Sequence, residues 1–238
     1  MIQLTLIRLN QYGKWTHTLG ENREHMLQVY QAEFYKIIQK KFSSLGGIVF
    51  QNRQDELFAI TNGIGVHTHQ KIIAELELLF PFDILMFIGY GTTPFTANRA
   101  ILNLIQSTAA KKGVFGNPGT QGQIYIIHSD IQGITKISND ISPYEVSNLV
   151  HKVYRLVSEF FMDKNSLTFF MGGDNFITVL GADAENSVPD LTHMIKEEMG
   201  LTLNCGMGTG ISALEAVTMA TTSLDAIRAL RDVQLVSA

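Results

Sequence analysis

Apolar and polar positions along the chain follow one order of periodicities, and this order occurs twice. An apolar run of strand length comes first. A stretch follows with apolar side chains at a period of about 3.6 residues, which predicts an amphipathic helix. Two short apolar runs then predict a hairpin. The first half predicts strand, helix, strand, strand, helix and strand at residues 2–9, 23–42, 46–52, 56–61, 67–79 and 82–90, with a further helix that begins at Thr93–Pro94.

The second half repeats this order. Its predicted elements are residues 122–129, 143–161, 167–171, 176–180, 189–199 and 201–206, with a last helix at 212–230. Three blocks align at a spacing of about half the chain: 4–13 with 123–133, 46–60 with 166–180, and 88–101 with 205–218. In this alignment Asn10 falls opposite Asp130, Gly13 opposite Gly133, and Asp55 opposite Asp174. The chain is therefore predicted to be an internal duplication.

The repeated order β-α-β-β-α-β is the ferredoxin-like arrangement. We predict an α+β fold with two tandem ferredoxin-like domains, each an antiparallel four-stranded sheet with helices on one face. The domains are placed at residues 1–110 and 122–238. Residues 111–121 have no apolar period and contain glycine and proline, so they are predicted to be a linker.

Composition limits the classes of function. Hydrophobic residues make up 45% of the chain and charged residues 17%, which is typical of a globular protein. The net charge of −4 and the lack of a long basic run argue against binding of a nucleic acid polymer. No apolar run is long enough to span a membrane. Cys205 is the single cysteine, which excludes an internal disulfide and a Cys-rich zinc site. We expect a cytoplasmic protein and an inert Cys205 in the core.

Two aspartates in the second half are the main candidates for chemistry. Asp130 ends the first strand of that half, and Asp174 lies in the turn of the hairpin. The ferredoxin-like arrangement brings both to one edge of the sheet. Their carboxylates and the backbone carbonyl of Ile131 are hard oxygen ligands that suit Mg²⁺. We therefore expect Asp130 and Asp174 to be catalytic, and these two with Ile131 to bind the metal.

Other residues near these positions are candidates for substrate binding. Gly172 and Gly173 suit a tight turn that lets the backbone approach a ligand. The alternative is that Asp174–Asn175 is an ordinary hairpin turn, where Asp and Asn are common. For the arginines, the alternative is a solvated surface. The candidates are Gly133, Gly172, Gly173, Asn175, Asn10, Tyr12, Arg53, Asp55 and Arg228.

The first half is not expected to hold a complete two-aspartate metal site. Asn10 replaces the acid at the strand end, and only Asp55 remains. One half is then expected to do the chemistry while the other shapes the pocket. Lys14 and Trp15 follow the first strand's turn and are candidates to line a pocket, although Trp15 suits a core position equally well.

Several segments resemble the GTP cyclohydrolase III family. They are MIQLTLIRLNQYGKWT, GGIVFQNRQDELFAITNGI, FIGYGTTPFTA, HSDIQGIT and FFMGGDNFIT, which together cover nearly the whole chain in order. The resemblance implies two palm-like domains, related to GGDEF domains and class III nucleotide cyclases. It also implies an Mg²⁺-dependent enzyme, aided by a monovalent cation such as K⁺. The implied reaction opens the imidazole ring of GTP to a formylamino-pyrimidine ribonucleotide monophosphate and releases two phosphates.

The resemblance further implies a homo-oligomer, with Asp130 and Asp174 as the residues that hold the metals. This chain departs from the family at Asn10, where an aspartate is usual, and at Lys14, where a proline is usual. Two alternatives stay open: a nucleotidyl cyclase that acts on GTP or ATP, and a nucleotide-binding paralogue without catalysis. The hairpin sequence GGDN departs from the GGDEF or GGEEF of the cyclases.

Overall fold

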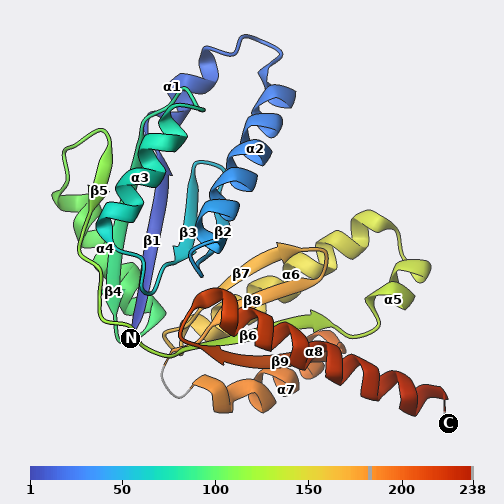
Figure 1. Cartoon of the computed structure of the whole chain (residues 1–238). Helices are drawn as coiled ribbons and strands as arrows, with labels where there is room; N and C mark the ends of the chain where they lie inside the picture. Colours follow the sequence, from blue (N-terminus) through green and yellow to red (C-terminus); the bar gives the residue numbers. More distant parts are fainter. Residues whose placement is uncertain (182–183, 237–238) are drawn as a thin grey trace. The chain divides into compact units, whose positions relative to one another are not determined.

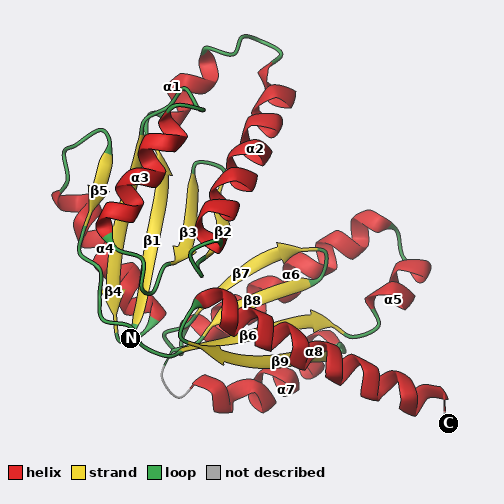
Figure 2. Cartoon of the chain, in the orientation of Figure 1, coloured by secondary structure: helices red, strands yellow, loops and turns green. Residues whose placement is uncertain are grey.

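The chain forms two compact units, each built around one sheet (Figure 1). The computed structural model describes residues 1–181 and 184–236, with side chains up to residue 230. Unit 1 comprises residues 1–92, 96–122 and 212–214, and unit 2 comprises the other described residues. Both units combine helices with a largely antiparallel sheet (Figure 2), which confirms the predicted α+β class. No helix in the described part of the chain has the length and apolar character that crossing a membrane requires.

Unit 1 contains the seven elements predicted from the sequence, and two more. Its elements are β1 (Ile2–Leu9), α1 (Tyr12–His17), α2 (Arg23–Ser43), β2 (Ile48–Arg53), β3 (Glu56–Ile60), α3 (Val66–Glu77), β4 (Ile84–Gly91), α4 (Pro94–Ser107) and β5 (Gly113–Phe115). The short helix α1 and the short strand β5 were not predicted. Residues 113–115 lie in the segment expected to be a linker, yet they pair in parallel with β4.

The strand order of the first sheet is β2-β3-β1-β4-β5, and all pairs except β4–β5 are antiparallel. Helices α2 and α3 supply Phe34, Ile38 and Leu76 to a core under one face of the sheet. The trailing helix α4 packs on the other face, where a Cβ at Gly89 would come within 2.2 Å of the Ala97 carbonyl oxygen. Glycine in β4 therefore allows this helix to approach the strand.

Unit 2 repeats the arrangement. Its elements are β6 (Ile124–Ile131), α5 (Ile134–Asp140), α6 (Pro143–Met162), β7 (Leu167–Gly172), β8 (Asn175–Val179), the 3-10 helix η1 (Ala184–Ser187), α7 (Val188–Met199), β9 (Leu203–Gly210) and α8 (Ala213–Val236). The strand order β7-β8-β6-β9 matches β2-β3-β1-β4. Helix α6 begins with the predicted capping box, in which Ser142 and Glu145 bond each other's backbone N–H.

The glycines of β9 have a packing role. A Cβ at Gly206 would lie 2.3 Å from the Ala220 carbonyl oxygen, and one at Gly208 would lie 2.2 Å from the Ala220 nitrogen. Because real Cβ atoms do not approach a backbone so closely, these positions need glycine for α8 to lie against β9. The buried residues Val153, Val157 and Ile195 of α6 and α7 fill the core on the other face.

The strand register corrects one part of the predicted alignment. The two hairpins match, because each has its irregularity at the same place, between Gln51 and Arg53 and between Phe170 and Gly172. In that match Asp174 corresponds to Asp55, and Phe176 corresponds to Leu57. Leu57 pairs with Ile7, whereas Phe176 pairs with Ser129. The structural counterpart of Asp130 is therefore Arg8, one residue after Ile7, and not Asn10.

The alignment was wrong because it matched the glycines that follow the two strands. Gly133 adopts a left-handed backbone with a φ of 72°, and its counterpart with the same conformation is Gln11, with a φ of 53°. Gly13 instead lies inside α1. Because a left-handed residue is usually glycine, the sequence favoured Gly13 and shifted the first strand by two residues.

Candidate functional site

Asp130 is a buried carboxylate near the end of β6. It is 5% exposed and faces α8. Asn204 Nδ2 donates to its Oδ1 at 2.7 Å, and Arg228 Nε donates to its Oδ2 at 2.6 Å. Arg228 also donates to Asp225 Oδ1 at 2.9 Å, so its guanidinium joins a buried and an exposed carboxylate. Residues from β6, β9 and α8 therefore fix the position of Asp130.

Asp174 lies in the turn between β7 and β8, where Gly172 and Gly173 both have positive φ angles of 95° and 60°. The backbone N–H groups of Asp174 and Ile131 lie near its carboxylate and act to lower its pKa. Burial and the nearby negative charge of Asp130 raise the pKa of the Asp174 carboxyl above its ordinary value. The ionised form is therefore disfavoured in spite of the nearby Arg228, and a bound cation would favour it.

A cavity of about 580 Å³ joins these two aspartates. Asp130, Ile131, Gly133, Asp174 and Arg228, all predicted from the sequence, line it. The residues that sequence reasoning missed are Ile134, Thr135, Lys136, Asn139 and Asn204. The predicted meeting of the hairpin turn with the end of the first strand thus holds in unit 2, although their metal-binding role stays a prediction.

A second, more apolar cavity of about 440 Å³ adjoins the first and shares Ile134, Thr135 and Asp174 with it. Phe170, Val146 and Val150 form part of its wall, and Gly172 and Gly173 bring backbone to its edge. The absence of side chains at both glycines keeps this edge open. The two cavities together offer one polar and one apolar compartment on either side of Asp174.

Asn175 belongs to a hydrogen-bonded chain beneath the hairpin. Its Nδ2 donates to Asp174 Oδ1 at 3.3 Å, and its Oδ1 accepts from His128 Nε2 at 3.1 Å. His128 Nδ1 lies 3.0 Å from Thr221 Oγ1 on α8. Burial lowers the pKa of His128, which favours the neutral form of its ring. Asn175 therefore supports Asp174 and does not line either cavity.

The donor set of unit 2 fits a hard divalent cation. Two carboxylates line one cavity, and the charge of one disfavours ionisation of the other. Among the described residues there is no group of three or more His, Cys, Asp and Glu side chains that would bind a metal. A cation here would therefore depend on backbone carbonyl, water or substrate oxygens for its remaining ligands, as Mg²⁺ commonly does.

The candidates in unit 1 do not form an equivalent site. Arg53 and Asp55 pair with each other in the hairpin, with Nη2 2.8 Å from Oδ2. Tyr12 packs beside Trp15 and its hydroxyl accepts from Gln31. Asn10 Nδ2 donates to the Lys111 carbonyl at 2.6 Å. Of these four, Asn10 lines a unit 1 cavity of about 790 Å³, and the other three do not line it.

At the position of Asp130, unit 1 has a cation. Arg8 Nε lies 2.7 Å from Glu56 Oε1, and the guanidinium lies 5.8 Å from the centre of the Phe87 ring. Glu56 corresponds to Asn175 in the hairpin match. An internal ion pair thus occupies the place where unit 2 has a carboxylate beside Asp174.

The residues that sequence reasoning missed share one property. Asn204, Lys136 and Asn139 belong to elements other than the two that carry the aspartates, and no local motif surrounds them. For Asn204 a signal exists, because a polar residue interrupts the apolar start of the last strand at Leu203–Cys205. Lys136 and Asn139 lie on α5, a short helix that the apolar period did not reveal.

Comparisons with known proteins agree in one family. A family model described as GTP cyclohydrolase III matches residues 1–238. The GTP cyclohydrolase III of Methanothermobacter thermautotrophicus is 33% identical over 236 residues, covering 96% of this chain and 95% of that protein. The protein of the same name from Methanocaldococcus jannaschii is 33% identical over 237 residues, covering 96% and 88%.

Solved structures with detectable similarity are more distant. The GGDEF domain of DgcB from Caulobacter crescentus, in complex with c-di-GMP, has a TM-score of 0.40 and 11% identity over 44% of this chain and 72% of that chain. A bacterial light-regulated adenylyl cyclase has a TM-score of 0.42 and 14% identity over 97% of this chain and 83% of that chain.

Proposed function

The chain belongs to the GTP cyclohydrolase III family, and from this premise we propose that it is a GTP cyclohydrolase whose reaction takes place in the two adjoining cavities of unit 2. The reaction opens the imidazole ring of GTP to a formylamino-pyrimidine ribonucleotide monophosphate. One water adds at the ring carbon, and two more cleave the phosphoanhydrides to release two phosphates. The observation that carries the location is that Asp130 and Asp174 line one cavity.

Mg²⁺ is the proposed metal, held by Asp130, Asp174 and the backbone carbonyl of Ile131. When bound, Mg²⁺ would neutralise part of the triphosphate charge and would activate water as a Lewis acid. The chain's own residues prepare this arrangement. Asn204 and Arg228 orient Asp130, and the side-chain amide of Asn175 donates to Asp174.

The substrate is proposed to divide between the two cavities. The polar cavity carries Lys136 and Arg228, whose positive charges suit the phosphates. The apolar cavity, with Phe170 and Val150, suits the purine and limits water around it. The backbone at Gly172 and Gly173 can approach the nucleotide because no side chain intervenes.

A product assay tests the proposal. Purified protein is incubated with GTP and Mg²⁺, the loss of purine absorbance and the release of phosphate are followed, and the product is identified by mass spectrometry. We expect two phosphates per ring opened. Asp130→Asn should lower kcat/KM by about two to three orders of magnitude, the usual loss when an electrostatic contact to the transition state is removed.

Asp190→Asn, an exposed aspartate on α7, is the matched control and should leave the rate unchanged. Cyclic nucleotide or pyrophosphate among the products would favour the nucleotidyl cyclase instead. Tight GTP binding without any turnover, over a range of K⁺ concentrations and pH, would favour the non-catalytic paralogue.

Three further properties belong to the proposal. K⁺ is expected to assist the reaction, because the family's activity is aided by a monovalent cation, and replacement of K⁺ by a large organic cation should then slow turnover. The protein is expected to be a homo-oligomer, which light scattering after size exclusion would measure. A cytoplasmic location is expected for an enzyme that acts on GTP, and cell fractionation would test it.

A further inference from the structure

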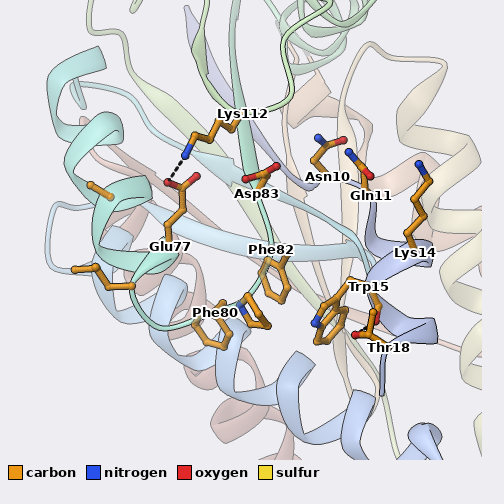
Figure 3. Close-up of a pocket in the computed structure, with 13 residues that line it drawn as sticks. Asn10, Gln11, Lys14, Trp15, Thr18, Glu77, Phe80, Phe82, Asp83 and Lys112 are labelled. Atoms are coloured by element: carbon orange, nitrogen blue, oxygen red, sulfur yellow. Dashed lines mark hydrogen bonds and ion pairs between the residues drawn. The ribbon is translucent and has the colours of Figure 1, made fainter. Parts of the chain in front are cut away.

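Unit 1 contains a cavity of about 790 Å³ that the proposed reaction does not use. It lies between α1, the end of α3 and the start of β4, with Lys112 beside it (Figure 3). Figure 3 shows Trp15, Phe80 and Phe82 along one side and Glu77, Asp83 and Asn10 along another. The size suits a ligand of nucleotide dimensions, since such pockets usually measure about 300–1,000 Å³.

This cavity is not the counterpart of the aspartate site in unit 2. The hairpin between β2 and β3, which corresponds to the GGDN hairpin, contributes no residue to it. It instead depends on Lys112, which directly precedes β5, and the described part of unit 2 has no counterpart of β5. The two cavities share one corresponding position, since Gln11 is the counterpart of Gly133, but they differ in the hairpin and in Lys112. The role of this cavity therefore need not follow from the duplication.

The aromatic side of the cavity suits a flat ligand. Phe80 and Phe82 are buried, 6% and 7% exposed, and close the floor. Trp15 is half-buried and packs edge-on against Phe82 with ring centres 5.1 Å apart, and against Tyr30 at 5.3 Å. The neighbouring rings hold the indole in place, so that a planar heterocycle can stack on it at little entropic cost.

The polar side of the cavity contains carboxylate oxygens that lack a hydrogen-bond donor among the described residues. Glu77 Oε2 pairs with Lys112 Nζ at 3.3 Å, whereas its Oε1 is buried and has no hydrogen-bond partner among the described residues. Asp83 lines the same side, and its carboxylate has no ion-pair or hydrogen-bond partner in the described chain. A buried acceptor without a donor costs free energy, so a ligand with N–H groups would be favoured here.

One positive charge remains for an anionic group. Lys14 lies exposed at the rim, and its ammonium has no ion-pair partner within the described residues. Lys112, in contrast, is already paired with Glu77. The lining thus calls for a ligand that combines a planar ring, adjacent N–H donors and an acidic group.

We propose that this cavity is a second, non-catalytic binding site for a guanine nucleotide. The base stacks on Trp15, its N1–H and N2–H₂ donors face Asp83 and Glu77, and its phosphate meets Lys14. Guanine fits better than adenine because the equivalent edge of adenine presents an acceptor at N1, which two carboxylates would repel. The site is independent of hydrolysis in unit 2, because none of its residues belongs to that unit.

The chain supplies its own reporter, because Trp15 is the single tryptophan. The full-length protein is titrated with GMP, and separately with AMP, in EDTA so that metal-dependent chemistry cannot occur. Trp15 fluorescence is recorded with correction for nucleotide absorbance. We expect saturable quenching by GMP and at least about tenfold weaker binding of AMP, a difference within the range for one lost hydrogen-bonding contact.

Substitutions then locate the site. Asp83→Asn and Glu77→Gln should each raise the GMP dissociation constant about tenfold, because an amide presents a donor to the base. Glu33→Gln, an exposed residue on α2, is the matched control and should change nothing. Asp174→Asn should also leave the quenching intact. Circular dichroism melting of each variant shows whether it is folded.

Three results would overturn the proposal: no change in Trp15 fluorescence with GMP, equal affinities for GMP and AMP, or quenching that Asp174→Asn abolishes while Asp83→Asn does not. Since the titration needs neither metal nor turnover, its failure would leave the product assay of the proposed hydrolysis unaffected.

Discussion

Arg8 of unit 1 and Asp130 of unit 2 occupy equivalent positions on the central strands of two sheets with the same strand order. Both are held by polar partners, Arg8 by Glu56 and Asp130 by Asn204 and Arg228. In unit 1 the positive charge of Arg8 is neutralised by Glu56. In unit 2 the carboxylate of Asp174 lies near that of Asp130, and nearby positive charge does not fully offset the repulsion between them. One backbone arrangement thus supports either a structural ion pair or a site that attracts a cation.

The hairpin aspartates give the sharpest test of this difference. Asp174 and Asp55 are counterparts in matching hairpin turns. Asp174→Asn should lower kcat/KM for GTP by about two to three orders of magnitude, because it removes charge next to the proposed phosphoryl and metal site. Asp55→Asn should change the rate less than about threefold, since among the described residues Asp55 forms its ion pair with the exposed Arg53. Equal losses in steady-state assays of the two variants would contradict the assignment of chemistry to unit 2.

The ion pair of unit 1 is expected to matter for stability and not for turnover. The side chains of Arg8 and Glu56 are 30% and 12% exposed. Arg8→Met leaves the Glu56 carboxylate partly buried without its partner, which should lower the free energy of unfolding by about 1–3 kcal/mol. Urea denaturation measures this loss.

The double variant Arg8→Met with Glu56→Leu is the control, because it removes both charges together. It should recover most of the lost stability. If the double variant were as unstable as Arg8→Met, packing of the arginine stem against Phe87 would explain the effect better than charge.

The sequence predicted the elements whose apolar period is long, and missed those without one. Helix α6, with Val150, Val153 and Val157 on one face, was placed within one residue of its observed ends. Helices α1 and α5 have no fully buried residue, so their sequences contain no apolar stripe that would predict a helix. Strand β5 has only three residues, which is too short to show an alternation.

The sequence predicted the residues of the candidate site that belong to recognisable local motifs, and missed the others. Asp130 lies at the end of a strand and Asp174 in a glycine-rich turn, so both were identified, and Gly133 and Arg228 line the same cavity. The predicted counterpart of Asp130, Asn10, was wrong because the register of β1 and β6 depends on their pairing with β3 and β8. The sequence of a single segment does not reveal this pairing. Asn204 was missed for the same reason, since only pairing with β6 brings it to Asp130.

The uncompensated charge in unit 2 predicts a stability effect that depends on pH. The pKa of Asp174 is raised in the folded state, so the folded protein binds more protons than the unfolded one between the ordinary carboxyl pKa and the raised value. The ionised carboxylate therefore costs stability as pH rises through that window. In EDTA at neutral pH, Asp174→Asn should raise the Tm modestly. This increase in Tm should shrink as the pH falls below the ordinary pKa of an aspartate carboxyl.

Asp55→Asn is again the counterpart and should give no such gain, because Arg53 already compensates Asp55. Calorimetry of both variants at neutral and acidic pH measures the difference. A gain for Asp174→Asn that did not depend on pH would indicate altered hydrogen bonding of the turn in place of charge. Mg²⁺ should raise the Tm of the wild type if it binds beside Asp174 and offsets its charge. The Tm advantage of Asp174→Asn over the wild type should then disappear when Mg²⁺ is added.

Cys205 offers the smallest effect and a probe of unit 2 alone. It lies on β9 next to Asn204, and burial together with the charge of Asp130 raises the pKa of its thiol to about 12. At pH 8 very little thiolate is present, so alkylation by iodoacetamide should be far slower in the native protein than in guanidinium. Since Asp130 contributes to the raised pKa, Asp130→Asn should modestly speed native labelling, whereas Asp55→Asn in unit 1 should not. Rapid labelling of the native wild-type chain would show that the β9 edge of unit 2 opens in solution, and that the buried geometry of Asp130 does not persist there.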